Sequence, residues 1–295
     1  MFQSAQSRAV AALVGASFLF GATFVVVKSA LDDITPLSFV AWRFLIGAII
    51  LFALALPRGR EIWVHGTIAG VALFAGYALQ TAGLQYTSAS NSALITGLYV
   101  VLTPFLAAIF ARRAPSPLVV LGAVIAFVGV YLLTGVDTLT LGLGDLLTVG
   151  CALAFAFHIV ALARFAHRHP VVPFTAVQIL VTTLLAFPAS WIFDGGITVP
   201  PRSTWVALAI TGVGVTAGAF LLQIWAQRVV GAATAAVVLA AEPAFGVATG
   251  WVVLDERLTV AGWIGAALIV VAIFVVITNQ RDPASREAEG LTVAH

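Results

Sequence analysis

The sequence predicts an all-α integral membrane protein with ten transmembrane helices, arranged as two inverted five-helix repeats. Of its 295 residues, 61% are hydrophobic and 9% are charged, and the mean hydropathy is +1.10. Soluble domains carry about 25% charged residues, so a soluble fold is excluded. Apolar runs long enough to cross a hydrocarbon core of about 30 Å recur along nearly the whole chain. A repeat relates the second half to the first.

Each apolar run is expected to form one span, and prolines such as Pro36, Pro57 and Pro115 stand between the runs as helix breakers. The apolar run after Arg8 begins like a signal peptide but continues through Val27, so we interpret it as an uncleaved first span. The expected spans are residues 9–30, 36–56, 64–84, 91–111, 116–134, 144–163, 173–193, 204–226, 231–253 and 259–278.

The cationic residues predict the orientation, because cytoplasmic loops are enriched in Lys and Arg. With the amino terminus inside, the cytoplasmic side holds Arg8, Arg58, Arg60, Arg112, Arg113, Arg164, Arg168, Arg228, Arg281 and Arg286, and the outer side holds Lys28, Arg43, Arg202 and Arg257. Both termini are therefore predicted to be cytoplasmic. The net charge of +2 is scattered over short loops, so we expect no nucleic-acid partner.

The repeat appears when the chain is shifted by 143 residues, which aligns the third to fifth spans with the eighth to tenth without a gap. The shift pairs Gln80 with Gln223 and Gly122 with Gly265, and glutamine is rare inside such spans. Five spans per half is an odd number, so the halves must cross the membrane in opposite directions. The predicted domains are residues 1–137, 138–280 and a cytoplasmic tail, 281–295.

Several short motifs resemble a known family. They are Arg228-Val-Val-Gly-Ala-Ala-Thr-Ala-Ala, Glu242-Pro243, Asp255-Glu256-Arg257-Leu258-Thr259, Tyr86-Thr-Ser-Ala-Ser-Asn-Ser-Ala-Leu, Phe20-Gly21 and Arg43. Over about residues 10–280 the chain resembles the drug/metabolite transporter superfamily, and within it the ten-helix EamA-type exporters. The first half departs from the pattern, because Tyr99-Val100 stands where the second half has Glu242-Pro243.

The resemblance implies a secondary transporter that exports small organic metabolites, neutral or aromatic amino acids above all, across the plasma (inner) membrane by alternating access. The alternative is a multidrug or cationic-metabolite exporter that uses Glu242 as its counter-charge. The expected partners are a small-molecule solute, membrane lipid and protons as a candidate coupling ion, with the protein a monomer or homodimer. No cofactor or metal is expected.

The sequence contains no motif of the enzyme classes that we considered. Lys28 is the only lysine and no P-loop motif occurs, so a P-loop ATPase is excluded within this chain. An intramembrane enzyme with Glu242 and His158 as acid and base remains an alternative, as does a passive channel, but no nucleophile motif supports the former. The single cysteine, Cys151, lies in an apolar segment and is interpreted as a core residue.

Glu242 is the first candidate binding residue, because a carboxyl inside an apolar span costs several kcal/mol unless it faces a cavity or a partner. It is interpreted as a protonatable site or, alternatively, as a hydrogen bond between helices. Counting about 1.5 Å per residue places Tyr77, Tyr99 and His158 at the same depth, which predicts one cavity near the midplane. Packing is the alternative for these three.

Gln80 and Gln223 complete the predicted substrate-binding set, with hydrogen bonding between helices as their alternative role. Lys28 and Arg43 are predicted to lie toward the outer surface, in a gating or substrate role. Arg43 is about seven residues into its span, deep enough to attract a carboxylate or to pair with Asp32 or Asp33. A polar stripe at helical spacing, Ser92, Thr96, Tyr99 and Thr103, is predicted to face protein or water.

Overall fold

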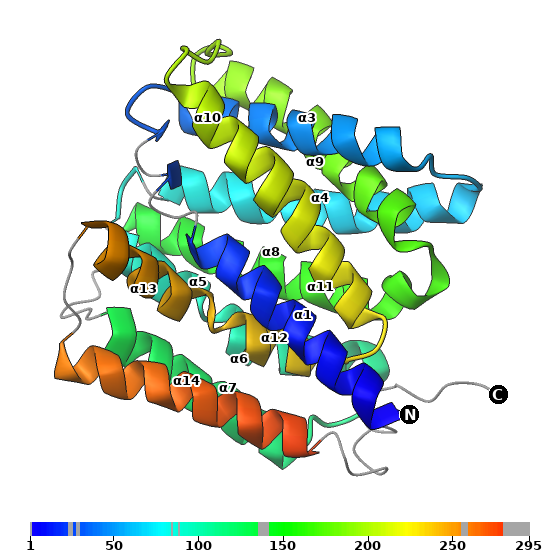
Figure 1. The fold of residues 1–295 in the computed structure, drawn as a ribbon, viewed down its shortest axis with the longest axis vertical. Helices are drawn as coiled ribbons and strands as arrows, with labels where there is room; N and C mark the ends of the chain where they lie inside the picture. Colours follow the sequence, from blue (N-terminus) through cyan, green and yellow to red (C-terminus); the bar gives the residue numbers. More distant parts are fainter. Residues whose placement is uncertain are drawn as a thin grey trace.

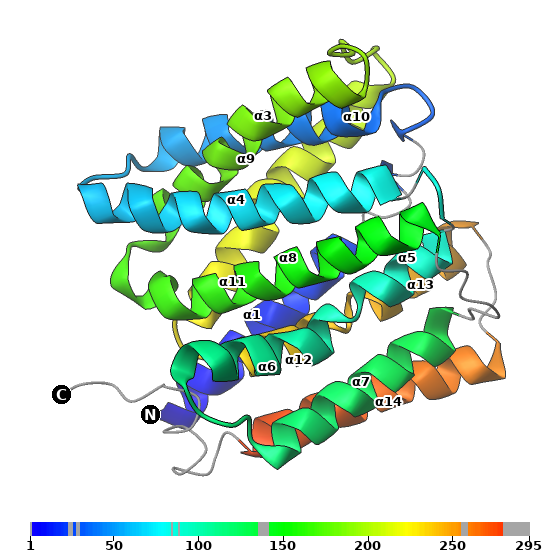
Figure 2. The same ribbon diagram turned by 180° about the vertical axis from the view of Figure 1, so that it is seen from behind.

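The computed structural model describes residues 2–22, 26–27, 30–83, 85–87, 89–134, 142–254 and 259–279, and within these ranges it contains helices and no strand. Eight of the described helices are long and apolar enough to cross a membrane, and two shorter apolar helices, Pro117–Leu133 and Ala232–Gly246, add to them. The prediction of an all-helical membrane fold is confirmed, and the helices match the ten predicted spans (Figures 1 and 2).

The helices of the first half are α1 (Phe2–Ala22), α3 (Pro36–Leu54), α4 (Arg60–Gly83), α5 (Ala89–Thr96), α6 (Tyr99–Ala111) and α7 (Pro117–Thr134). Those of the second half are α8 (Leu143–Phe165), η1 (Ala166–Arg168), α9 (Val171–Phe193), α10 (Thr204–Ala209), η2 (Ile210–Ala219), α11 (Phe220–Gln227), α12 (Ala232–Leu239), α13 (Glu242–Leu254) and α14 (Val260–Asn279). The η2 segment is a π-helical stretch that joins α10 to α11 in one span.

Local sequence explains several helix ends. Pro36 opens α3, where a proline loses no helical hydrogen bond. Arg112 ends α6 in the left-handed conformation (φ 52°) that commonly closes a helix. Asp194, at the end of α9, accepts hydrogen bonds from the backbone N–H groups of Leu37 (2.9 Å) and Ser38 (3.2 Å). The second half therefore caps the start of α3 in the first.

The fourth and ninth spans are each broken into two helices near the middle. The first break lies between Thr96, which ends α5, and Tyr99, which begins α6. The second lies between Leu239, which ends α12, and Glu242, which begins α13. The 143-residue shift found in the sequence superimposes these two breaks, so they are equivalent positions of the repeat.

The two halves interlock, because the first span of each half packs along the broken span of the other. Helix α1 contacts α12 and α13, while α8 contacts α5 and α6. Helices α7 and α14 lie side by side in both views (Figures 1 and 2). A Cβ added at Gly265 would lie 2.5 Å from the carbonyl oxygen of Gly129, so this contact requires glycine.

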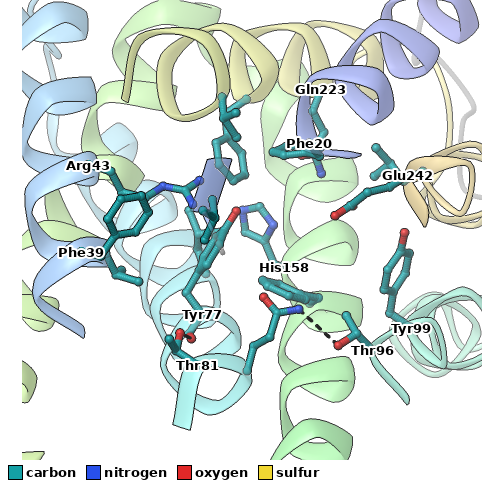
Figure 3. Close-up of a pocket in the computed structure, with 18 of the residues that line it drawn as sticks. Phe20, Phe39, Arg43, Tyr77, Thr81, Thr96, Tyr99, His158, Gln223 and Glu242 are labelled. Atoms are coloured by element: carbon teal, nitrogen blue, oxygen red, sulfur yellow. Dashed lines mark hydrogen bonds between the residues drawn. The ribbon is translucent and has the colours of Figure 1, made fainter. Parts of the chain in front are cut away.

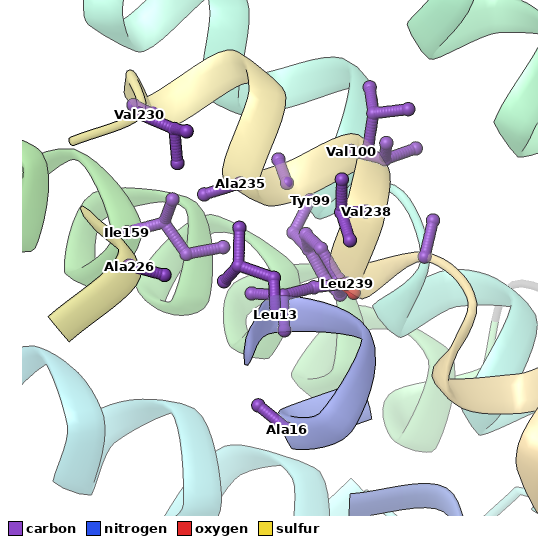
Figure 4. Packing of buried hydrophobic residues seen from close by; sticks show 14 of the residues in the cluster. Leu13, Ala16, Tyr99, Val100, Ile159, Ala226, Val230, Ala235, Val238 and Leu239 are labelled. Atoms are coloured by element: carbon purple, nitrogen blue, oxygen red, sulfur yellow. The ribbon is translucent and has the colours of Figure 1, made fainter. Parts of the chain in front are cut away.

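One end of the bundle is filled by apolar side chains between the halves. Figure 4 shows this packing, which joins the middle of α1 to the end of α11, to α8 and to α12. Its members include Leu13, Ala16, Ile159, Ala226, Val230, Ala235, Val238 and Leu239, and all are buried. We call this cluster the packed end. It lies on the side where α1 begins and α14 ends (Figure 1), which the cationic residues predict to be cytoplasmic.

Candidate functional site

A cavity of about 140 Å³ lies between the two halves at the level of the helix breaks (Figure 3). A cavity of about 150 Å³ in a protein core accepts benzene, so this one is large enough for a small organic molecule. Its lining residues are Phe20, Val27, Leu31, Pro36, Phe39, Val40, Arg43, Leu73, Tyr77, Gln80, Thr81, Thr96 and Tyr99 from the first half, and Phe155, His158, Ile159, Val215, Phe220, Gln223, Leu239 and Glu242 from the second.

The structure brings together all six residues that the sequence predicts to bind substrate, since each of them lines this cavity: Tyr77, Gln80, Tyr99, His158, Gln223 and Glu242. Counting residues along each span predicted one cavity for Tyr77, Tyr99, His158 and Glu242, and these four residues line the same cavity. Their role in binding remains a prediction.

Tyr99 and Glu242 occupy equivalent places, because each is the first residue of the helix that follows a break. The Glu242 carboxylate has no hydrogen-bond or salt-bridge partner in the part of the chain that the structure describes, and it points into the cavity (Figure 3). Gly21 of α1 packs against the backbone here, and a Cβ at Gly21 would overlap the carbonyl oxygen of Glu242. This leaves a carboxyl group facing the cavity at a helix N-terminus.

Arg43 lies in the cavity wall and is 5% exposed, and its predicted gating or substrate role remains a prediction. Its Nε donates a hydrogen bond to Oγ1 of Thr216 in the π-helical stretch (3.3 Å). Its guanidinium carbon lies 5.0 Å from the ring centroid of Tyr77 and 5.3 Å from that of Phe44, distances at which a cation is attracted to an aromatic ring.

The predicted pairing of Arg43 with Asp32 or Asp33 does not form. Asp32 is exposed, and the carboxylate of Asp33 accepts a hydrogen bond from Oγ of Ser203 (2.7 Å). The physical reason is distance along the helix, because Arg43 lies two turns into α3 while both aspartates precede that helix. Lys28, the other predicted outer-side charge, lies outside the described residues.

Aromatic rings form much of the wall. Tyr77 packs edge to face against Phe155, with ring centroids 5.4 Å apart, and Phe220 packs in the same way against Phe20 at 5.2 Å. His158 also meets Phe220 edge to face at 6.1 Å. Such contacts hold the rings in fixed orientations around the cavity.

His158 is held by a residue that the sequence analysis did not single out. Its Nε2 lies 2.7 Å from Oε1 of Gln178 on α9, and both side chains are buried. The Nε2 of Gln178 has no hydrogen-bond partner among the described residues. Gln178 is another glutamine inside an apolar span, so the rarity that drew attention to Gln80 and Gln223 could have identified it.

The two predicted glutamines both line the cavity and also bond to neighbouring residues. Gln80 Nε2 donates to Oγ1 of Thr96 at the end of α5 (3.2 Å; dashed in Figure 3). Gln223 Nε2 donates to Oε1 of Gln227 (3.1 Å), and Gln227 Nε2 donates to the carbonyl oxygen of Ile159 on α8 (2.9 Å). The second chain of bonds ties α11 to α8 beside the packed end.

The polar stripe of the fourth span, Ser92, Thr96, Tyr99 and Thr103, is buried against protein as predicted, and Cys151 is buried as a core residue. Thr96 Oγ1 lies 3.8 Å from its sulfur. Within the described ranges, no group of three or more His, Cys, Asp or Glu side chains is placed to hold a metal ion.

A multi-pass helical bundle whose two halves enclose a solute-sized cavity is the architecture of a membrane transporter. The model of the EamA-like transporter family matches residues 7–135 and 142–278, and the chain therefore belongs to this family within the drug/metabolite transporters. It is a multi-pass membrane protein, consistent with a place in the plasma membrane, and a transporter rather than an enzyme.

Relatives agree with this assignment. An uncharacterized transporter of Archaeoglobus fulgidus is 33% identical over 260 residues, covering 88% of this chain and 82% of that protein. The uncharacterized transporter YwfM of Bacillus subtilis is 26% identical over 285 residues, covering 92% and 95%. One crystal structure of a protein superimposes with a TM-score of 0.77 at 25% identity, covering 92% of this chain and 97% of that one.

Proposed function

We propose that the protein exports small organic metabolites, and neutral or aromatic amino acids above all, across the plasma membrane by alternating access. One observation carries the proposal, which is the cavity that both halves line at their helix breaks. Inverted-repeat transporters bind their solutes near the midplane, between the repeats and at discontinuous helices. Residues 1–137 and 138–280 are the two units that we expect to move against each other.

The cavity wall supports a small solute with an apolar part. A volume of about 140 Å³ admits a molecule of roughly one aromatic ring. The rings of Tyr77, Phe155 and Phe220 offer apolar faces, while the tips of Tyr99 and His158 offer hydrogen-bonding groups. A neutral or aromatic amino acid combines these features.

The two ends of the cavity differ, which supports alternating access. On the side where α1 begins, Leu13, Ala226 and Val230 fill the space between the halves. On the opposite side the cavity continues past Val27 and Leu31 toward the start of α3. With the predicted orientation this is an outward-facing conformation, and export requires the packed end to separate so that solute can enter from the cytoplasm.

Glu242 is the candidate coupling group, since a carboxylate that faces a cavity without a partner can take up and release a proton as the halves move. His158 is the second candidate, because imidazole is the side chain that changes charge most readily near neutral pH. Either would couple export to a proton gradient.

Solute counterflow in proteoliposomes tests the proposal. Purified protein is reconstituted in vesicles loaded with a pool of amino acids, and uptake of each labelled amino acid is followed with and without a proton gradient. Transient accumulation of neutral or aromatic amino acids, absent from protein-free vesicles, is the expected result. A folded protein that shows no counterflow with any amino acid would contradict the proposed solute class. Flux that neither saturates nor shows counterflow would indicate a channel.

A second candidate function, export of cationic metabolites or drugs, is favoured by the unpaired Glu242 carboxylate alone. It predicts that Glu242→Gln abolishes transport of an organic cation and leaves neutral solutes unaffected. Glu61→Gln, at an exposed position in the first turn of α4, is the matched control. Retention of cation transport by Glu242→Gln would eliminate this candidate.

A further inference from the structure

In the described part of the chain, the cavity is lined by one arginine and one glutamate side chain that form no salt bridge with each other. Among the lining residues that the structure describes, Arg43 and Glu242 are the only Lys, Arg, Asp or Glu side chains. They come from different halves, Arg43 from α3 and Glu242 from the start of α13. Figure 3 shows both pointing into the cavity from opposite walls. In the part of the chain that the structure describes, no salt bridge joins them to each other or to another side chain.

Arg43 is held on its own wall by the contacts described above. Its Nε is bonded to Thr216, and its guanidinium lies against the ring of Tyr77. These contacts orient the side chain but supply no anion. An arginine fork pairs best with a carboxylate, through two parallel hydrogen bonds from its nitrogen atoms. The wall around Arg43 therefore lacks the partner that such a group requires.

Glu242, on the opposite wall, lacks a cationic partner among the described residues. An isolated carboxylate removed from water is costly unless it is paired or takes up a proton. Because the two side chains lie on opposite walls of one cavity (Figure 3), a ligand that carries both signs can satisfy both groups at once.

We propose that Arg43 and Glu242 bind the two ends of a zwitterion, Arg43 the carboxylate and Glu242 the ammonium group, so that these residues select amino acids over their singly charged analogues. The inference rests on the proposed function and deepens it, because it assigns the two recognition contacts and the orientation of the solute. The side chain of the solute then lies against Tyr77, Phe155 and Phe220.

Singly charged solutes fit this arrangement less well. A monocation supplies no anion for Arg43 and is repelled by it. A monoanion supplies no cation for Glu242 and is repelled by its carboxylate. A neutral polyol pairs with neither. Discrimination thus arises as much from the charge left unpaired as from the contact that is made.

The test uses three compounds of nearly equal size: phenylalanine, its amide, which is a cation, and 3-phenylpropionate, which is an anion. Each is measured as a competitor of labelled phenylalanine counterflow in proteoliposomes. The wild-type protein should prefer phenylalanine to both analogues by about 30-fold or more, because each analogue leaves one buried charge unpaired. Arg43→Gln should remove the preference over the amide only. Glu242→Gln should remove the preference over 3-phenylpropionate only.

Matched controls separate recognition from general damage. Arg60→Gln and Glu61→Gln remove the same charges at exposed positions of α4 and should leave both preferences intact. Arg43→Lys keeps the charge without the fork, so it should retain part of the preference over the amide, and it replaces Arg43→Gln if that variant does not fold. Size-exclusion chromatography of each purified variant reports folding.

The outcomes are distinguishable. Phenylalanine counterflow with wild-type preference below about threefold, or with both variants changing all three compounds alike, overturns the zwitterion assignment and leaves the proposed function standing. Absence of counterflow with every amino acid overturns the proposed function and the assignment together. The crossed pattern, with each variant losing a different preference, establishes the assignment.

Discussion

The two broken spans, α5 with α6 and α12 with α13, share one backbone geometry and differ in chemistry. In the first, the N–H of Leu98 donates to the carbonyl of Ile95 (3.0 Å). In the second, the N–H of Ala241 donates to the carbonyl of Val238 (3.1 Å). The 143-residue shift superimposes these bonds, so the break itself is a repeated feature of the chain.

The two breaks differ at the equivalent positions Val100 and Pro243. Val100 donates its N–H to the carbonyl of Gly97 (3.1 Å), whereas the equivalent Pro243 has no N–H to donate. Beside it, Tyr99 in the first half is replaced by Glu242 in the second. The comparison teaches that the fold repeats the helix break in both halves. The residues at the break differ, so that only the second half has a carboxyl group there, at Glu242 next to Pro243.

The largest expected effect comes from truncating the two equivalent residues. Glu242→Ala should lower counterflow by about 30-fold or more, because a charged contact in a desolvated site is worth at least about 2 kcal/mol. Tyr99→Phe removes one neutral hydrogen-bonding group and should lower it by about tenfold at most. Initial rates per amount of folded protein in the vesicles measure both. Equal losses would show that the breaks are chemically equivalent after all.

Gly21 tests the packing that only the second break receives from α1. Gly21→Ala places a Cβ against the carbonyl oxygen of Glu242 and should destabilise the protein by about 1–3 kcal/mol. Gly15→Ala is the matched control on the same helix, since its Cβ would meet its nearest neighbour at an ordinary 3.6 Å. Thermal unfolding in detergent is the measurement. A similar loss in both variants would mean that the contact at Gly21 is not special.

Pro243→Val makes the second break chemically like the first by restoring an N–H. The new donor should bond to the carbonyl of Ala240, as Val100 bonds to Gly97, and stabilise the protein by about 1 kcal/mol. Thermal unfolding measures this effect, and counterflow shows whether the stiffened break slows transport. An unchanged or lowered unfolding temperature would argue against the missing bond as the difference between the breaks.

The smallest expected effect lies away from both breaks, where His169 meets His65. Their ring nitrogens are 2.7 Å apart, His169 follows η1, and His65 is in the first turns of α4. Burial lowers the pKa of His169 from its ordinary 6.5; His65, Arg168 and His167 lower it further, and Glu61 opposes the shift. This contact joins segments on the side that we expect to be cytoplasmic.

A lowered pKa means that the unfolded chain takes up a proton before the folded protein does. Stability should therefore be complete above pH 6.5 and decline as the pH falls below it toward the lower folded value. Unfolding temperatures from pH 8 to 5 measure this dependence, which should be weaker in His169→Gln than in the wild type. An unchanged profile in that variant would show that other groups carry the acid sensitivity.

Much of the site could be predicted because its signals lie within single spans. Glu242 is conspicuous in an apolar helix, and counting residues placed Tyr77, Tyr99 and His158 at one depth. Gln178 was missed because its importance comes from contact with His158 on another helix. The pairing of Arg43 with Asp32 or Asp33 was left open because hydropathy along one span does not report which way a side chain points into the bundle.

The sequence by itself determined the number and approximate limits of the spans, the 143-residue repeat and the equivalence of Tyr99 with Glu242. These properties depend on the cost of placing polar groups in lipid, which acts on each segment separately. The tertiary structure decided that Arg43 faces Glu242, that Gln178 holds His158 and that the halves close at the packed end. Such contacts depend on the rotation, tilt and breaks of helices packed against one another, and no single segment contains that information.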